Sequence, residues 1–111
     1  MPDFDPEKNQ ITVKEVAEKI ERGDEFRFID IRGPEFRAKA NIEGSEDATE
    51  EVMEDLLSQP PDTDIVIFCH RGISSIDATQ FFLDQGFTNV RSMIGGIGAW
   101  SHEIDPSVPR Y

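Results

Sequence analysis

One short segment of the chain combines the side chains that nucleophilic catalysis requires. Residues 65–75, IVIFCHRGISS, place the only cysteine, Cys69, after four apolar residues and directly before His70, Arg71 and Gly72. The thiolate is the reactive form of cysteine, and nearby positive charge or a helix N-terminus stabilises it. The segment therefore suggests a nucleophilic thiolate that faces an anionic substrate. Two plainer interpretations stay open: Cys69 can be a small core residue, and His70 and Arg71 can be solvated loop residues.

The elements on either side of this loop would position Cys69. Residues 65–68 form a continuous apolar run, which is typical of a strand buried on both faces of a parallel sheet. Residues 74–85 show helical spacing, and Ser74 with Asp77 fits a Ser-x-x-Asp capping box. In an open α/β sheet, ligands bind beyond the carboxyl ends of the strands. The sequence therefore predicts that Cys69 lies at such a ligand-binding edge.

The loop itself is predicted to form an anion cradle. Gly72 permits a tight turn that aims several backbone N–H groups inward, and the positive end of the following helix adds to their field. The same field would lower the pKa of the Cys69 thiol, and the charge of Arg71 would act in the same direction. On a chain with a formal net charge of −12, this site would be a local positive exception.

The remaining chain alternates helices and strands. The pair Thr12 and Glu15 forms a capping box for a helix over residues 13–22, which stops at Gly23. The expected core face of that helix carries Val13, Val16, Ala17 and Ile20. The sequence also predicts strands at 26–31 and 90–94, helices at 47–59 and 97–103, and a core that includes Trp100 and the phenylalanines. Strands separated by helices favour a layered α/β domain.

Composition narrows the class of protein. A chain of 111 residues fits one domain. It has 23 acidic and 11 basic residues, and this excess of negative charge repels phosphate backbones and anionic lipid. Neither nucleic acid nor a membrane is therefore an expected partner. No run is long enough to span a bilayer, and the start of the chain lacks a signal-peptide pattern. One cysteine and two histidines are too few for a zinc cluster, so we expect no metal and a reduced thiol in the cytoplasm.

Four segments resemble the successive signatures of the rhodanese-like (sulfurtransferase) domain family. They are FIDIRGPEF at 28–36, ANIEGS at 40–45, IVIFCHRGISS at 65–75 and GFTNVRSMIGGIGAW at 86–100. They follow the family's order over nearly the whole chain; the cysteine loop is the functionally specific part. The resemblance implies one three-layer α/β domain over residues 1–111, with a core at about 11–104 and a five-stranded parallel sheet flanked by helices.

The resemblance also implies a reaction. Cys69 would take a sulfane sulfur from thiosulfate or another small anionic donor, and sulfite would leave. The resulting persulfide would pass its outer sulfur to cyanide, a small thiol or a protein thiol, with no cofactor. The residues that would cradle the persulfide and the departing anion are His70, Arg71, Gly72, Ile73, Ser74 and Ser75, and Asp30 and Arg32 match the family's Asp-x-Arg as supporting residues.

The chain departs from the family pattern at three places. Ser74 stands where the family often has the arginine of Cys-x-x-Gly-x-Arg, which makes Arg71 the expected substitute. Asn41 replaces a common histidine that makes a supporting contact. Gly98 replaces a common acid, which predicts a less stable last helix.

Other functions remain open at this stage. The same sequence would suit a non-catalytic binding module, a sulfur relay or a redox-sensing thiol. A cysteine-type phosphatase is disfavoured, because it needs Cys-x5-Arg and Ser75 stands at that arginine position. The family often occurs fused to other domains, although Met1 and the complete motif set favour a self-standing chain.

Overall fold

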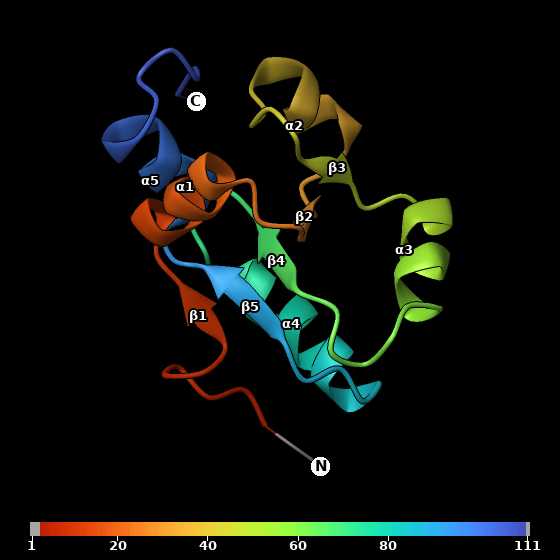
Figure 1. Cartoon of the computed structure of the whole chain (residues 1–111). Helices are drawn as coiled ribbons and strands as arrows, with labels where there is room; N and C mark the ends of the chain where they lie inside the picture. Colours follow the sequence, from red (N-terminus) through yellow and green to blue (C-terminus); the bar gives the residue numbers. More distant parts are fainter. Residues whose placement is uncertain (1–2, 111) are drawn as a thin grey trace.

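A parallel β-sheet forms the centre of the fold (Figure 1). In the computed structural model, which describes residues 3–110, its strands are Gln10–Ile11 (β1), Arg27–Asp30 (β2), Glu46–Asp47 (β3), Ile65–Phe68 (β4) and Val90–Met93 (β5). They stand in the order β1-β5-β4-β2-β3, and every neighbouring pair is parallel. The predicted α/β class with a five-stranded parallel sheet is confirmed. Met1 and Tyr111, named in the sequence predictions, lie outside the described residues.

Helices cover both faces of this sheet. They are Val13–Arg22 (α1), Pro34–Lys39 (α2), Glu50–Leu57 (α3), Ser74–Asp84 (α4) and Gly96–Glu103 (α5). Helices α1 and α5 lie side by side on one face (Figure 1), while α3 and α4 supply core residues to the other. No helix within the described residues is long and apolar enough to cross a membrane.

Strand β4 shows why the sheet has two cores. All four of its residues are buried, and they alternate between the faces. Val66 and Phe68 join a cluster with Val16 and Trp100, whereas the other two strand residues join a second cluster with Leu56 and Phe82. Because β4 is central and covered on both faces, its apolar run needs no polar alternation.

Helix α1 has the bounds that its capping signals predict. The Thr12 hydroxyl accepts the Glu15 N–H and the Glu15 carboxylate accepts the Thr12 N–H, both at 3.1 Å. The expected core face is wrong at one position, because Ile20 is 44% exposed while Lys19 is buried. The ammonium of Lys19 pairs with Asp64, which lets its methylene stem lie in the interior.

Several other bounds differ from the sequence predictions. The predicted strands 26–31 and 90–94 are shorter, the last helix starts at Gly96 rather than at residue 97, and α4 ends at Asp84. The predicted helix 47–59 is wrong at its start, since Asp47 lies in β3 beside Asp30 and the helix begins only after Thr49, whose hydroxyl accepts the Val52 N–H. Local residue patterns did not indicate β1, α2 or β3. The strands β1 and β3 have two residues each and form only through their partners, and the six-residue helix α2 buries none of its residues, so it leaves no apolar periodicity.

Candidate active site at the end of β4

Cys69 follows β4 directly and faces the N-terminus of α4. Its side chain is almost fully buried, at 5% exposure, and the thiol is free. The sulfur accepts the backbone N–H groups of Gly72 at 3.1 Å and Ser75 at 3.4 Å, and it lies 3.4 Å from the Ser75 hydroxyl oxygen. The loop thus wraps its N–H groups around the sulfur, which is the arrangement that stabilises an anion.

These contacts explain the acidity of the thiol. Burial raises the pKa of Cys69, but hydrogen bonds from the side chain and backbone of Ser75 and from the Gly72 backbone outweigh it, so the net pKa lies below the ordinary value. The backbone N–H of Arg71 acts in the same direction. The expectation that the charge of Arg71 lowers this pKa is corrected: its side chain is exposed, and its contribution comes from the amide.

Close backbone packing against α5 holds the loop in shape. Gly72 has φ +84°, and a Cβ there would lie 2.6 Å from the Gly95 nitrogen. A side chain at Gly96 would collide with the carbonyl of Cys69. The amide of Gly98 donates to the His70 carbonyl at 3.0 Å, so the glycine expected to weaken α5 lies where the loop approaches the helix closely. The glycine-rich segment therefore lets the cysteine loop pack closely against α5, in addition to its part in the fold.

A cavity of about 280 Å³ opens beside the sulfur. It is lined by Ile31, Arg32, Phe36, Cys69, His70 and Ser74. A larger cavity of about 510 Å³ lies against α2 and the C-terminal segment, but it does not contain the cysteine. The smaller cavity is therefore the candidate substrate site, because of these two cavities only this one is lined by both the nucleophile, Cys69, and a cationic side chain, Arg32.

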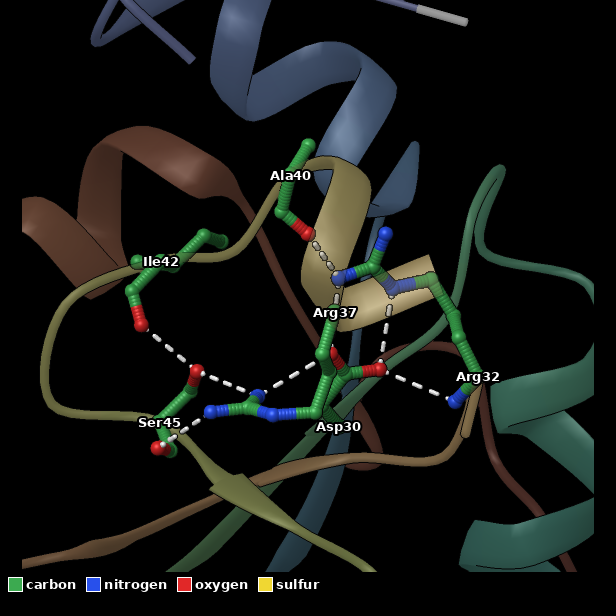
Figure 2. A network of polar contacts seen from close by, with 6 residues as sticks. All are labelled: Asp30, Arg32, Arg37, Ala40, Ile42 and Ser45. Atoms are coloured by element: carbon green, nitrogen blue, oxygen red, sulfur yellow. Dashed lines mark hydrogen bonds and ion pairs between the residues drawn. The ribbon is translucent and has the colours of Figure 1, made fainter. Parts of the chain in front are cut away.

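Figure 2 shows the ion-pair network that holds the cation of this cavity. The fully buried carboxylate of Asp30 binds Arg32 at 2.7 Å and Arg37 at 3.1 Å. Arg32 also donates to the Ala40 carbonyl at 2.6 Å, and Arg37 donates to the Ser45 hydroxyl at 2.9 Å. The network fixes the segment from α2 to β3 against the end of β2, where Asp30 pairs with the residue before Cys69.

The structure places the predicted loop residues in three different surroundings. His70 and Ser74 line the cavity, and Gly72 and Ser75 contact the sulfur. Arg71 and Ile73 belong to neither set and are exposed, Ile73 at 72%, and Ser74 is also exposed, at the mouth of the cavity that it lines. Asn41, also discussed above, is exposed as well.

The predicted capping box of α4 is wrong. The N-cap is Ile73 and has no side-chain cap, and Ser74 is already helical. The physical reason is that this helix start is organised around the cysteine. Its Ser75 amide donates to sulfur, and the Ser75 hydroxyl points inward to Ser92 at 2.6 Å.

Two further residues of the site did not emerge from the sequence. Arg37 shares Asp30 with Arg32, and Ser92 lies beneath Ser75. A signal for Ser92 exists, because a serine inside a buried parallel strand is unusual and must find a partner. Among the described residues no group of three or more His, Cys, Asp or Glu side chains could hold a metal ion.

Comparisons with known proteins agree with this architecture. The model of the rhodanese-like domain family matches residues 12–103. The thiosulfate sulfurtransferase GlpE of Pseudoalteromonas translucida is 31% identical over 90% of this chain and 95% of its own. The adenylyltransferase and sulfurtransferase MOCS3-1 of Zea mays is 28% identical over 96% of this chain, which spans only 24% of the maize protein. The human single-domain sulfurtransferase TSTD1 superposes with a TM-score of 0.71 at 22% identity, over 85% of this chain and 96% of the human one.

Proposed function

This chain belongs to the rhodanese-like domain family, and we propose that it is a sulfurtransferase that carries the transferred sulfur as a persulfide on Cys69. The observation that carries the proposal is the sulfur of Cys69, which accepts two backbone N–H groups beside a cavity that contains Arg32. Relatives named as sulfurtransferases support the reaction class, although one of them is much longer than this chain.

The proposed reaction has two displacement steps. The thiolate of Cys69 attacks the sulfane sulfur of thiosulfate, an S–S bond forms on the enzyme, and the S–S bond of thiosulfate breaks as sulfite leaves with the electron pair. A thiolate or cyanide then attacks the outer sulfur of the persulfide, and Cys69 leaves as thiolate. The cradle of N–H groups stabilises the negative charge on the Cys69 sulfur, both in the resting thiolate that attacks the donor and in the thiolate that leaves in the second step.

The charges near the cavity suit an anionic donor. Asp30 carries one negative charge, and its two ion-pair partners, Arg32 and Arg37, carry two positive ones, so the network holds one excess positive charge. This excess lies beside Cys69 on a strongly acidic protein. It supports a small anion as donor, and Arg71 adds an exposed positive charge nearby.

The deciding experiment is the intact mass of the reduced protein after incubation with thiosulfate. We expect a gain of one sulfur atom, its loss after cyanide is added, and no gain in Cys69→Ser. Serine is close to cysteine in size, so the variant should keep its circular dichroism spectrum. A folded wild-type protein that gains no sulfur from thiosulfate, while iodoacetamide still alkylates it, would contradict thiosulfate as donor.

A sulfur relay or redox-sensing thiol is the second candidate, because it would use the same cradle. Repeated turnover with thiosulfate and cyanide supports an enzyme, whereas one loading per chain without turnover supports a relay. Phosphatase chemistry has little support, since Ser75 occupies the position of the required arginine and its hydroxyl is buried against Ser92. The physiological acceptor and a cytoplasmic location stay predictions.

A further inference from the structure

A pair of buried hydroxyl groups lies directly behind the sulfur of Cys69. Ser75 on α4 and Ser92 on β5 are both 0% exposed, and their oxygens are 2.6 Å apart. The Ser75 oxygen in turn lies 3.4 Å from the sulfur. The three side chains therefore form a continuous chain from the interior of the sheet to the nucleophile.

We propose that Ser92 is a positioning residue, whose hydroxyl orients Ser75 so that Ser75 donates its hydrogen to the sulfur of Cys69. An effect of Ser92 on sulfur transfer would rest on the proposed function. The orientation itself concerns the resting thiolate and can be measured without any sulfur donor.

The direction of the hydrogen bonds follows from counting hydrogens. Each hydroxyl has one hydrogen to donate, and a thiolate can only accept. When Cys69 is ionised, Ser75 donates to the sulfur, so the short contact between the two serines requires Ser92 to be the donor. In this state both buried hydroxyl hydrogens have an acceptor.

The opposite direction leaves one hydrogen unpaired. If the Cys69 thiol donates to Ser75, then Ser75 donates to Ser92, whose hydroxyl has no other hydrogen-bond partner within residues 3–110. A buried donor without an acceptor is costly. The serine pair therefore favours the arrangement in which the sulfur accepts.

The fold explains why Ser92 can hold Ser75. Along β5, Val90 belongs to the core cluster on the α4 side, and Ser92, two residues further, points to the same side. The strand lies between β1 and β4, so its backbone is fixed by two neighbours. The hydroxyl of Thr79 donates to the Ser75 carbonyl at 2.7 Å, which fixes the Ser75 backbone but leaves its side-chain rotamer to Ser92.

The test is the pH profile of alkylation of Cys69 by iodoacetamide, which is clean because the chain has one cysteine. The variants are Ser92→Ala, Ser75→Ala and the double variant. We expect the midpoint to rise by about half a unit in Ser92→Ala and by about one unit in Ser75→Ala. The double variant should match Ser75→Ala, because Ser92 acts only through Ser75.

Matched controls separate this role from the general effect of removing a buried hydroxyl. Ser101 is also buried, at 1% exposure, and its hydroxyl donates to the Val108 carbonyl in a hydrogen bond of 2.6 Å that does not involve the cysteine. Ser101→Ala should therefore leave the alkylation midpoint unchanged. Ser92→Thr and Ser92→Val have nearly the same shape. Only the threonine variant should keep the wild-type midpoint.

Two results would overturn the proposal: an unchanged midpoint in Ser92→Ala, or a further rise when Ser92→Ala is added to Ser75→Ala. Equal midpoints in Ser92→Thr and Ser92→Val would do the same. Intact mass after thiosulfate treatment is measured in parallel. A wild-type chain that gains no sulfur but shows the expected alkylation midpoints would refute the proposed donor and retain the role of Ser92.

Discussion

The carbonyl oxygen of Cys69 accepts the backbone N–H of Ile97 at 2.9 Å, so the first turn of α5 holds the residue that carries the thiol. The next contact along the loop, between the Gly98 amide and the His70 carbonyl, continues this attachment. The cysteine loop and the start of α5 therefore form one packed unit, and changes at their contact should affect sulfur chemistry and stability together.

Gly72→Ala should damage both properties. The substitution forces a side chain into φ +84° and places its Cβ 2.6 Å from the Gly95 nitrogen. We expect a loss of about 2–4 kcal/mol in the free energy of unfolding. Because the Gly72 N–H also binds the sulfur, persulfide formation should fall at least tenfold. Urea unfolding and intact mass after thiosulfate treatment measure the two effects.

Gly86→Ala is the matched control for this prediction. Gly86 has a similar φ of +96°, but a Cβ there meets nothing within 4 Å. It should cost only the backbone strain, about 1–2 kcal/mol, and leave sulfur loading unchanged. Equal losses in the two variants would show that the contact between Gly72 and Gly95 is not tight in solution.

The acidity of Cys69 should be visible in its pH dependence. The unfolded thiol has a pKa of about 8.5, and the folded pKa is lower. The group therefore contributes stability that is full above about pH 8.5 and is lost as the pH falls through the folded pKa. The alkylation midpoint should lie lower in the native protein than in urea, and the same midpoint in both states would contradict the hydrogen-bonded thiolate.

Asp30→Asn should destabilise the protein strongly. It leaves the arginines Arg32 and Arg37 without their shared carboxylate in a buried site, and breaking such a pair costs about 3–5 kcal/mol. Asp24→Asn, which removes the carboxylate of the exposed pair with Arg22, should move the urea midpoint far less. Comparable midpoint shifts in the two variants would argue against the structural role of Asp30.

Arg71→Ala should weaken the use of thiosulfate through long-range charge. The side chain is exposed, so we expect KM for thiosulfate to rise about twofold to fivefold at low salt and less at high salt, with kcat nearly unchanged. Arg22→Ala removes an exposed arginine at the end of α1 and should leave KM unaltered. A salt-independent rise in KM would instead indicate direct contact between Arg71 and the donor.

Local signals in the sequence determined those parts of the protein whose cause is local. The capping box at Thr12 and the glycine at residue 23 bound α1, and the apolar run of β4 predicted a central strand. Because Cys69 is the residue after this strand, the strand prediction also placed it at the carboxyl edge of the sheet. The resemblance to the family, carried by four segments of the sequence, predicted five strands and Cys69 as the nucleophile.

Only the tertiary structure decided the contacts between distant segments. The two-residue strand β3 exists because it pairs with β2, and Lys19 replaces Ile20 in the interior because Asp64 lies within reach. Ser75 meets Ser92, and not a cap of its own helix, because the sheet register directs Ser92 toward α4. A single sequence carries each side chain's chemistry and its local spacing, but the partner of a buried polar group is fixed only when the chain brings the two segments together.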